Sequence, residues 1–203
     1  RIDRRVQRLG PPSNYWRKFP PARSLGDLYA KSPLNALRTA RHVGRLMAED
    51  LIEIGITADC LPVLDVPQAG AHDVIGNRAY SLHIEHVMAL ARAHTAGLMD
   101  GGVLPVMKHI PGHGRAEVDS HHNLPVVNAR RQELEQVDFP PFAAFADAPM
   151  AMTAHVIYTA IDKTAPATLS RKIIKSVIRG QIGFRGLLIT DDLSMKALSG
   201  TME

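Results

Sequence analysis

The stretch GGVLPVMKHIPGHG, residues 101–114, decides the fold class. Its first two glycines end a helical pattern that runs from His83 to Asp100, and a short apolar run, Val103–Met107, follows them. An apolar run of this length between turn residues is typical of a buried strand. Lys108-His109 and a loop rich in proline and glycine come directly after it, which indicates that the strand ends at a functional edge.

The same strand and helix units recur along the chain. We expect strands over Thr57–Leu64, Val103–Met107, Met150–Ala154 and Leu187–Thr190. We expect helices from a capping Ser32 to Ile54, from His83 to Asp100, from Arg130 to Ala146 with a break near Pro140-Pro141, and from a capping Ser170 to near Gly183. Continuous apolar strands that alternate with helices predict an α/β fold with a parallel sheet covered by helices.

A polar side chain ends every one of these strands. The residues are Asp65, Lys108-His109, His155 and Asp191. In a parallel barrel these ends share one rim, which carries the chemistry, and an open doubly wound sheet also binds ligands at this edge. Because no glycine-rich phosphate loop follows any strand, we favour the (β/α)8 TIM-type barrel. A closed barrel takes about 250 residues, so we expect residues 1–203 to form a single barrel domain that is incomplete at both ends.

The composition excludes several classes of protein. Of 203 residues, 45% are hydrophobic and 22% charged, as in ordinary globular proteins. No run of eighteen apolar residues predicts a membrane helix, and the charged stretch from Arg1 to Arg8 does not resemble a signal peptide. The single cysteine, Cys60, excludes an internal disulfide and a zinc cluster built on cysteines. A net charge of +4 is too small to indicate a nucleic-acid partner, so we expect a cytoplasmic protein without nucleic-acid or membrane partners.

The loop after the second strand holds four of the ten histidines. It could be a solvated loop whose histidines are incidental. It could bind a metal ion, because His109, His113, Asp119 and His121 are all competent ligands. It could also be an acid/base device in which Asp119 orients and charges the imidazole of His121, since histidine gives and takes protons near neutral pH.

Asp191 ends the last strand, where packing explains a carboxylate poorly. Asp192 suits a helix cap, so we expect Asp191 to be the functional residue of the pair. A carboxylate that faces a proton donor across a pocket is the outline of glycoside hydrolysis. Arg78 lies in the loop after the first strand and Arg8 near the start of the chain. Each could bind hydroxyl groups or form a surface salt bridge.

Six motifs occur together in one order. They are RVQRL (5–9), PVLD (62–65), KHIPGHG (108–114), DSH (119–121), AHVIY (154–158) and DDLSM (191–195). With these motifs the chain resembles the family 3 glycoside hydrolases, and among them the bacterial β-N-acetylglucosaminidases of peptidoglycan recycling. The resemblance covers essentially the whole chain.

The resemblance implies a cytoplasmic, monomeric (β/α)8 barrel enzyme that needs neither metal nor cofactor. Its substrate would be N-acetylglucosamine β-linked to 1,6-anhydro-N-acetylmuramic acid, with or without a peptide. Asp191 would be the nucleophile and His121 the general acid/base, with Asp119 as its partner. The residues implied to bind the sugar hydroxyls are Arg8, Arg78, Lys108 and His109. A metal-dependent hydrolase that uses the histidine-rich loop and an inactive sugar-binding fragment remain the alternatives.

Overall fold

Four parallel strands form the sheet, and they lie side by side in the order of the chain. The structure, a computed structural model, describes residues 16–71, 73–116, 124–195 and 198. The strands are β1 (Ala58–Asp59), β2 (Leu104–Ile110), β4 (Met150–Thr153) and β6 (Leu187–Ile189), in the order β1-β2-β4-β6. Because the order of the described strands never reverses, the sheet winds in one direction, as in a barrel and unlike a doubly wound sheet.

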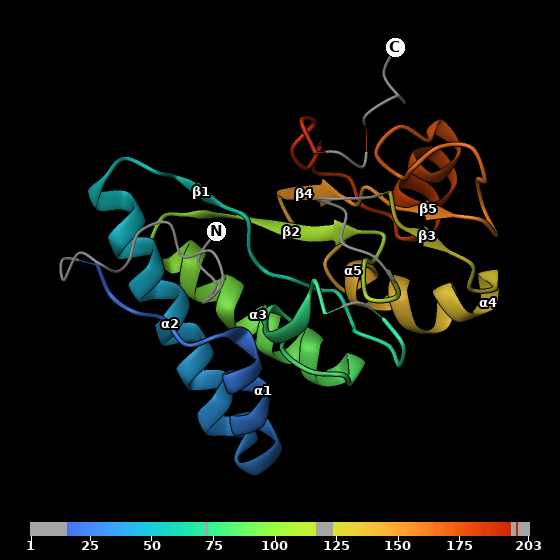
Figure 1. The fold of residues 1–203 in the computed structure, drawn as a ribbon. Coiled ribbons are helices and arrows are strands. Elements are labelled where there is room, and N and C mark those ends of the chain that lie inside the picture. The colour runs from blue at the N-terminus through green and yellow to red at the C-terminus, as the bar shows by residue number, and fades with distance from the viewer. Residues whose placement is uncertain (1–15, 72, 117–123, 196–197, 199–203) are drawn as a thin grey trace.

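Helical segments join each strand to the next. They are α3 (Ile84–Asp100) between β1 and β2, then α4 (Arg131–Glu133), η2 (Leu134–Asp138) and α5 (Phe139–Ala143) before β4, and η3 (Ile173–Gln181) before β6. Two helices, α1 (Ala22–Lys31) and α2 (Pro33–Glu53), precede the sheet, and η1 (Gly76–Arg78) is a single turn. Figure 1 shows α3 and α5 on the same side of β2. In the part of the chain that the structure describes, no helix is long and apolar enough to span a membrane.

A second, two-stranded parallel ladder lies beyond the carboxyl ends of the main strands. It pairs β3 (Val126–Val127) with β5 (Ile157–Tyr158). Each of its strands belongs to the connection that follows a strand of the main sheet, β2 or β4 (Figure 1). The ladder therefore links two of the loops that leave the functional edge of the sheet.

Helices α2 and α3 pack closely because glycine lies at their contact. A Cβ atom added at Gly97 of α3 would lie 1.9 Å from the carbonyl oxygen of Arg41 in α2. A Cβ atom at Gly44 of α2 would lie 2.2 Å from the carbonyl oxygen of His94 in α3. Neither distance leaves room for a side chain, so the absence of Cβ at both positions lets the two backbones approach.

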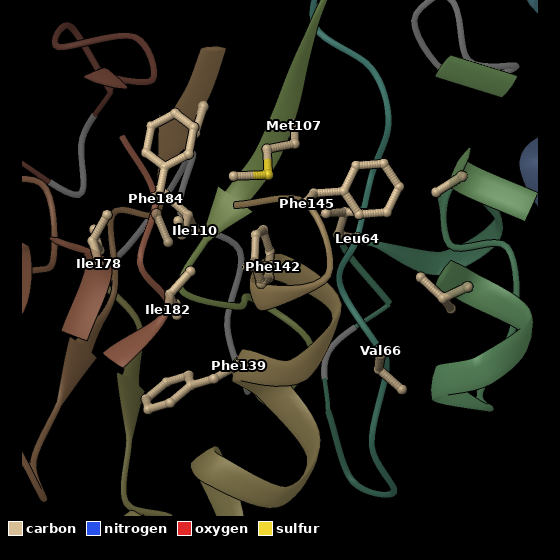
Figure 2. Packing of buried hydrophobic residues seen from close by; sticks show 14 of the residues in the cluster. Leu64, Val66, Met107, Ile110, Phe139, Phe142, Phe145, Ile178, Ile182 and Phe184 are labelled. Carbon is tan, nitrogen blue, oxygen red and sulfur yellow. The ribbon is translucent and has the colours of Figure 1, made fainter. Parts of the chain in front are cut away.

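The main core lies between β2 and the helical segments that cover it. Phe139, Phe142 and Phe145 recur every three residues and are all buried, as one face of a helical segment should be. Figure 2 shows these rings grouped with Met107 and Ile110 of β2. Both β2 side chains are fully buried in the same cluster, so β2 packs its Met107 and Ile110 side chains against the helices.

The helices confirm most of the sequence prediction, although their ends differ. Helices α2 and α3 occupy the predicted ranges within two residues. The hydroxyl of Ser170 accepts a hydrogen bond from the Ile173 amide at 3.1 Å, as expected of a cap. Ser32 lies at the N-cap of α2, directly before Pro33, as predicted, but its side chain makes no capping hydrogen bond. No sequence pattern described above predicts α1.

Two predictions about strand ends are wrong. β1 ends at Asp59, because Pro62 has no N–H to donate to a ladder, and beyond it only Val63 bridges to β2. β2 extends past the predicted Met107 to Ile110. The predicted break near Pro140-Pro141 is confirmed, because η2 ends at Asp138 and α5 begins at Phe139, which places Pro140 in a first turn where an N–H is not needed.

Candidate active site

A bulge at the carboxyl end of β2 directs two neighbouring polar side chains into the molecule. Lys108 pairs with Met152 and Ile110 with Thr153, so His109 is an extra residue in β2. A bulge of this kind re-aims side chains that would otherwise point to opposite faces. Lys108 and His109 are accordingly both buried. The pair predicted to follow the strand thus lies within β2, near its carboxyl end.

Asp65 holds the histidine of this pair. Its Oδ2 atom accepts a hydrogen bond from Nδ1 of His109 at 2.7 Å. Its Oδ1 atom accepts from two backbone amides, those of His109 at 3.2 Å and His113 at 2.7 Å. Asp65 is completely buried, so these three donors replace the water that a carboxylate would otherwise bind.

The electrostatics of this pair place the charge on Asp65. Burial alone would raise the pKa of Asp65, but the neighbouring His109 and His113 hold it at about 2. Burial lowers the pKa of His109 to about 4, although Asp65 opposes that shift. At neutral pH we therefore expect an ionised Asp65 and a neutral His109 that carries its proton on Nδ1. The Nε2 atom of His109 is then a hydrogen-bond acceptor.

Asp191 lies on the other side of the same imidazole. Its side chain is 11% exposed, and its Oδ2 atom lies 3.9 Å from Nε2 of His109. Its Oδ1 atom accepts a hydrogen bond from the Asp192 amide at 2.9 Å. The distance to His109 is too long for a direct hydrogen bond. The two acceptors therefore face one small region at the carboxyl ends of β2 and β6, where a hydroxyl group could donate to either of them.

Two of the predicted site residues are buried cations at a cavity whose lining does not include His109 or Asp191. Arg78 and Lys108 line one cavity of about 20 Å³, together with Tyr80 and His94. Burial lowers the pKa of His113, Asp65 raises it, and Arg78 and Asp191 act on it in opposite directions. Arg78 and Asp191 are therefore both near enough to act on the charge of His113. Of the predicted site residues, the structure places Asp191 beside His109, and Lys108 and Arg78 at one cavity.

The other predicted site residues, Arg8, Asp119 and His121, lie outside the described residues. The segment that leads toward 119–121 starts at the site. A Cβ atom at Gly114 would lie 2.1 Å from the carbonyl oxygen of Val66, so the two segments touch. Among the described residues, no three histidine, cysteine, aspartate or glutamate side chains are arranged to hold a metal ion.

Two residues of the site are not among those predicted to act in it. Asp65 is predicted only as a polar strand end, although the same position after a buried strand singles out Asp191. His113 is predicted only as a possible metal ligand, whereas its amide binds Asp65. The ring of His113 lies 5.6 Å from that of His109, measured between centroids. No sequence spacing indicates that contact.

The parallel sheet winds in one direction, and its carboxyl edge carries a buried carboxylate and imidazole pair beside a second carboxylate. These features define a barrel protein with an acid/base site. Comparison with known families identifies the class further. The model of the glycosyl hydrolase family 3 N terminal domain matches residues 5–203. The chain therefore belongs to this family.

Known relatives agree with this assignment. The beta-hexosaminidase of Chromobacterium violaceum is 41% identical over 185 residues, which are 90% of this chain and 51% of that protein. The beta-hexosaminidase of Alkalilimnicola ehrlichii is 41% identical over 182 residues, which cover 89% of this chain and 52% of that protein. The chain spans about half the length of these curated relatives.

Solved structures confirm the barrel prediction. NagZ from Neisseria gonorrhoeae, in complex with N-trifluoroacetyl-D-glucosamine, matches 100% of this chain and 58% of its own, with a TM-score of 0.89 and 36% identity. The same protein in complex with a zinc ion matches 97% of this chain and 57% of its own, with a TM-score of 0.87 and 35% identity. The fold is that of a TIM-type α/β barrel.

Proposed function

We propose that this chain carries the active site of a retaining exo-β-N-acetylglucosaminidase. The proposed substrate is N-acetylglucosamine linked to 1,6-anhydro-N-acetylmuramic acid, with or without a peptide, in cytoplasmic peptidoglycan recycling by a monomeric enzyme. The observation that carries the proposal is the position of the Asp191 carboxylate, 3.9 Å from a neutral imidazole that a buried Asp65 fixes. The beta-hexosaminidase names of the relatives support the substrate class.

In the first step, a carboxylate oxygen of Asp191 attacks the anomeric carbon as the bond to the leaving oxygen breaks. The imidazolium of His121, oriented by Asp119, gives its proton to that oxygen. In the second step, neutral His121 takes a proton from water, whose oxygen attacks the same carbon and releases Asp191. Two displacements at one carbon give net retention of configuration.

The described residues would hold the sugar for this reaction. Nε2 of His109 would accept a hydrogen bond from a sugar hydroxyl, because the bond from Nδ1 to Asp65 leaves Nε2 without a proton. Lys108 and Arg78 supply cationic donors, and we propose that these bind other hydroxyls, with Arg8 contributing from the start of the chain. Because Lys108 and Arg78 are buried, they would orient the sugar at little entropic cost.

Nitrophenyl N-acetyl-β-glucosaminide tests the assignment of Asp191. The variants Asp191→Asn and Asp191→Ala should abolish nitrophenol release, while calorimetry should still detect binding of N-acetylglucosamine. Asp147→Asn is the matched control, because that carboxylate is 76% exposed. Near-normal turnover in either Asp191 variant would exclude it as the nucleophile.

The same assay separates the two alternatives. A metal-dependent hydrolase would lose activity with a chelator and contain stoichiometric metal, whereas the proposed mechanism predicts unchanged turnover. A sugar-binding fragment would bind N-acetylglucosamine without any turnover. The proposed mechanism predicts that proton NMR of the first product shows the β-anomer, and an initial α-anomer would contradict retention.

A further inference from the structure

His155 follows β4 just as Asp191 follows the neighbouring β6, and its side chain is buried. Its Nε2 atom lies 3.1 Å from the carbonyl oxygen of Asp192, the residue after the proposed nucleophile. Its Nδ1 atom lies 2.7 Å from the hydroxyl of Thr168. The imidazole therefore bridges the connection after β4 to the segment that carries Asp191.

The chemistry of these partners fixes one proton on the ring. A carbonyl oxygen can only accept a hydrogen bond, so Nε2 of His155 must carry a hydrogen. In a neutral ring, Nδ1 is then an acceptor. The single hydrogen of the Thr168 hydroxyl has two acceptors within reach, this nitrogen at 2.7 Å and the carbonyl oxygen of Ala154 at 3.1 Å, and the shorter contact is the one to His155. The Thr153 hydroxyl lies 2.9 Å from that of Thr168 and can donate to it in turn. A series of hydrogen bonds thus connects Thr153, Thr168 and His155, and it ends at the carbonyl oxygen of Asp192 as the acceptor.

The acceptor at the end of this series belongs to a compact turn. The carbonyl oxygen of Asp192 also accepts from the Met195 amide at 3.2 Å. The carboxylate of Asp192 accepts from the amide and the hydroxyl of Ser194, at 2.9 and 2.7 Å. The Asp192 amide in turn binds the side chain of Asp191. A shift of this turn would therefore move the Asp191 carboxylate with it.

We propose that His155 is a positioning residue, which holds the turn at 192–195 against β4 and so places the Asp191 carboxylate for attack on the sugar. Thr168 keeps the ring in the orientation and tautomer that this requires. The inference rests on the proposed function of Asp191, but the hydrogen bond itself exists independently of turnover. The hydrogen bond that one ring nitrogen makes sets the tautomer and the orientation of an imidazole.

Paired substitutions test the role of the hydrogen bonds against the role of packing. We expect Thr168→Val to lower kcat/KM about 10-fold and His155→Leu about 100-fold, since small misplacements of a reacting group cost this much. We expect Thr168→Ser and His155→Gln, which keep a hydroxyl and an N–H donor, to stay within about threefold of the parent chain. Thr159→Val is a control, because the Thr159 hydroxyl bonds only to the β3 segment among the described contacts.

The dependence on the leaving group distinguishes positioning of the nucleophile from protonation. Thr168→Val should lower kcat/KM by the same factor with a nitrophenyl and with a methyl N-acetylglucosaminide, and so should His155→Leu, each by its own factor. In both variants KM should change less than kcat. Unchanged kcat in both folded variants would overturn the proposal, as would equal losses in the valine and serine variants of Thr168. Thermal unfolding of each variant establishes that it is folded.

Nitrogen-15 NMR of the imidazoles tests the hydrogen bond without any turnover. The signals of His155, assigned by their loss in His155→Gln, should show a proton on Nε2, and Thr168→Val should broaden or shift them. An unprotonated Nε2 would overturn the proposal. Absence of turnover in the unsubstituted chain, together with a protonated Nε2, would instead contradict the proposed function and leave the role of His155 in holding the turn supported.

Discussion

The substitution Asp65→Asn tests the role of the His109 imidazole most sharply, because the two oxygens of Asp65 have different partners. Oδ1 of Asp65 accepts both backbone amides, and an asparagine oxygen in the same place keeps these bonds. Only Oδ2 binds the imidazole of His109, and the asparagine would present N–H groups there. Nδ1 of His109 must then become the acceptor, so the ring proton moves to Nε2, which faces Asp191.

The magnitude follows from the same contacts. A hydrogen bond to a charged group contributes about 1.5–3 kcal/mol. The pKa of Asp65 falls from 3.8 to about 2 on folding, which corresponds to roughly 2–3 kcal/mol at neutral pH by linkage. Both routes agree, so we expect the free energy of unfolding to drop by about 2 kcal/mol. We expect a larger effect on turnover, a loss of about 100-fold or more, because the wrong tautomer cannot accept the sugar hydroxyl.

Urea unfolding, nitrogen-15 NMR and hydrolysis of the nitrophenyl substrate measure these three effects. Asp147→Asn is again the control, since its exposed carboxylate should contribute less than about 1 kcal/mol. A His109 ring that keeps its proton on Nδ1 in Asp65→Asn, or turnover within about threefold of the parent chain, would refute the reasoning.

Three further outcomes are expected. Gly97→Ala should lower the free energy of unfolding in urea by about 1–3 kcal/mol, because its Cβ atom would lie 1.9 Å from a backbone oxygen of α2. Gly180→Ala is the control and should cost less, because its Cβ atom would have its nearest contact at 3.1 Å. Equal costs would count against tight packing of α2 and α3. Burial lowers the pKa of His94 from 6.5 to about 4, so below pH 6.5 the unfolded chain binds a proton that the folded chain does not, and stability should fall between pH 6.5 and 4. His94→Gln should make the free energy of unfolding depend less on pH, whereas the exposed His42→Gln should leave that dependence as it is. An unchanged pH dependence in His94→Gln would exclude His94 as its origin. His121→Ala should slow substrates with poor leaving groups more than nitrophenyl ones, and equal losses would oppose its role as an acid.

Periodicity and strand-end chemistry predicted the parts of the fold that depend on local pattern. Helices α2 and α3 and the parallel sheet follow directly from apolar spacing. Local pattern does not reveal where a strand leaves its ladder. β1 stops early because Pro62 lacks an N–H, and β2 continues because a bulge absorbs His109, and both depend on the neighbouring strand.

The site was predictable to the extent that strand ends mark it. Asp191, Lys108 and His109 lie where a parallel sheet brings its carboxyl ends together. The pairing of Asp65 with His109 joins residues 44 positions apart, so only the fold reveals it. The same holds for the contact between His155 and Asp192, which joins the ends of neighbouring strands across 37 positions.

Identification of the residue that bonds to the sugar tests the account most directly. A fluorinated N-acetylglucosaminyl substrate, whose glycosyl-enzyme breaks down slowly, should leave one sugar attached to the protein. We predict that mass spectrometry of the digested protein places that sugar on Asp191 and on no other residue. Attachment to a different side chain, or continued turnover with Asp191 never modified, would contradict the account.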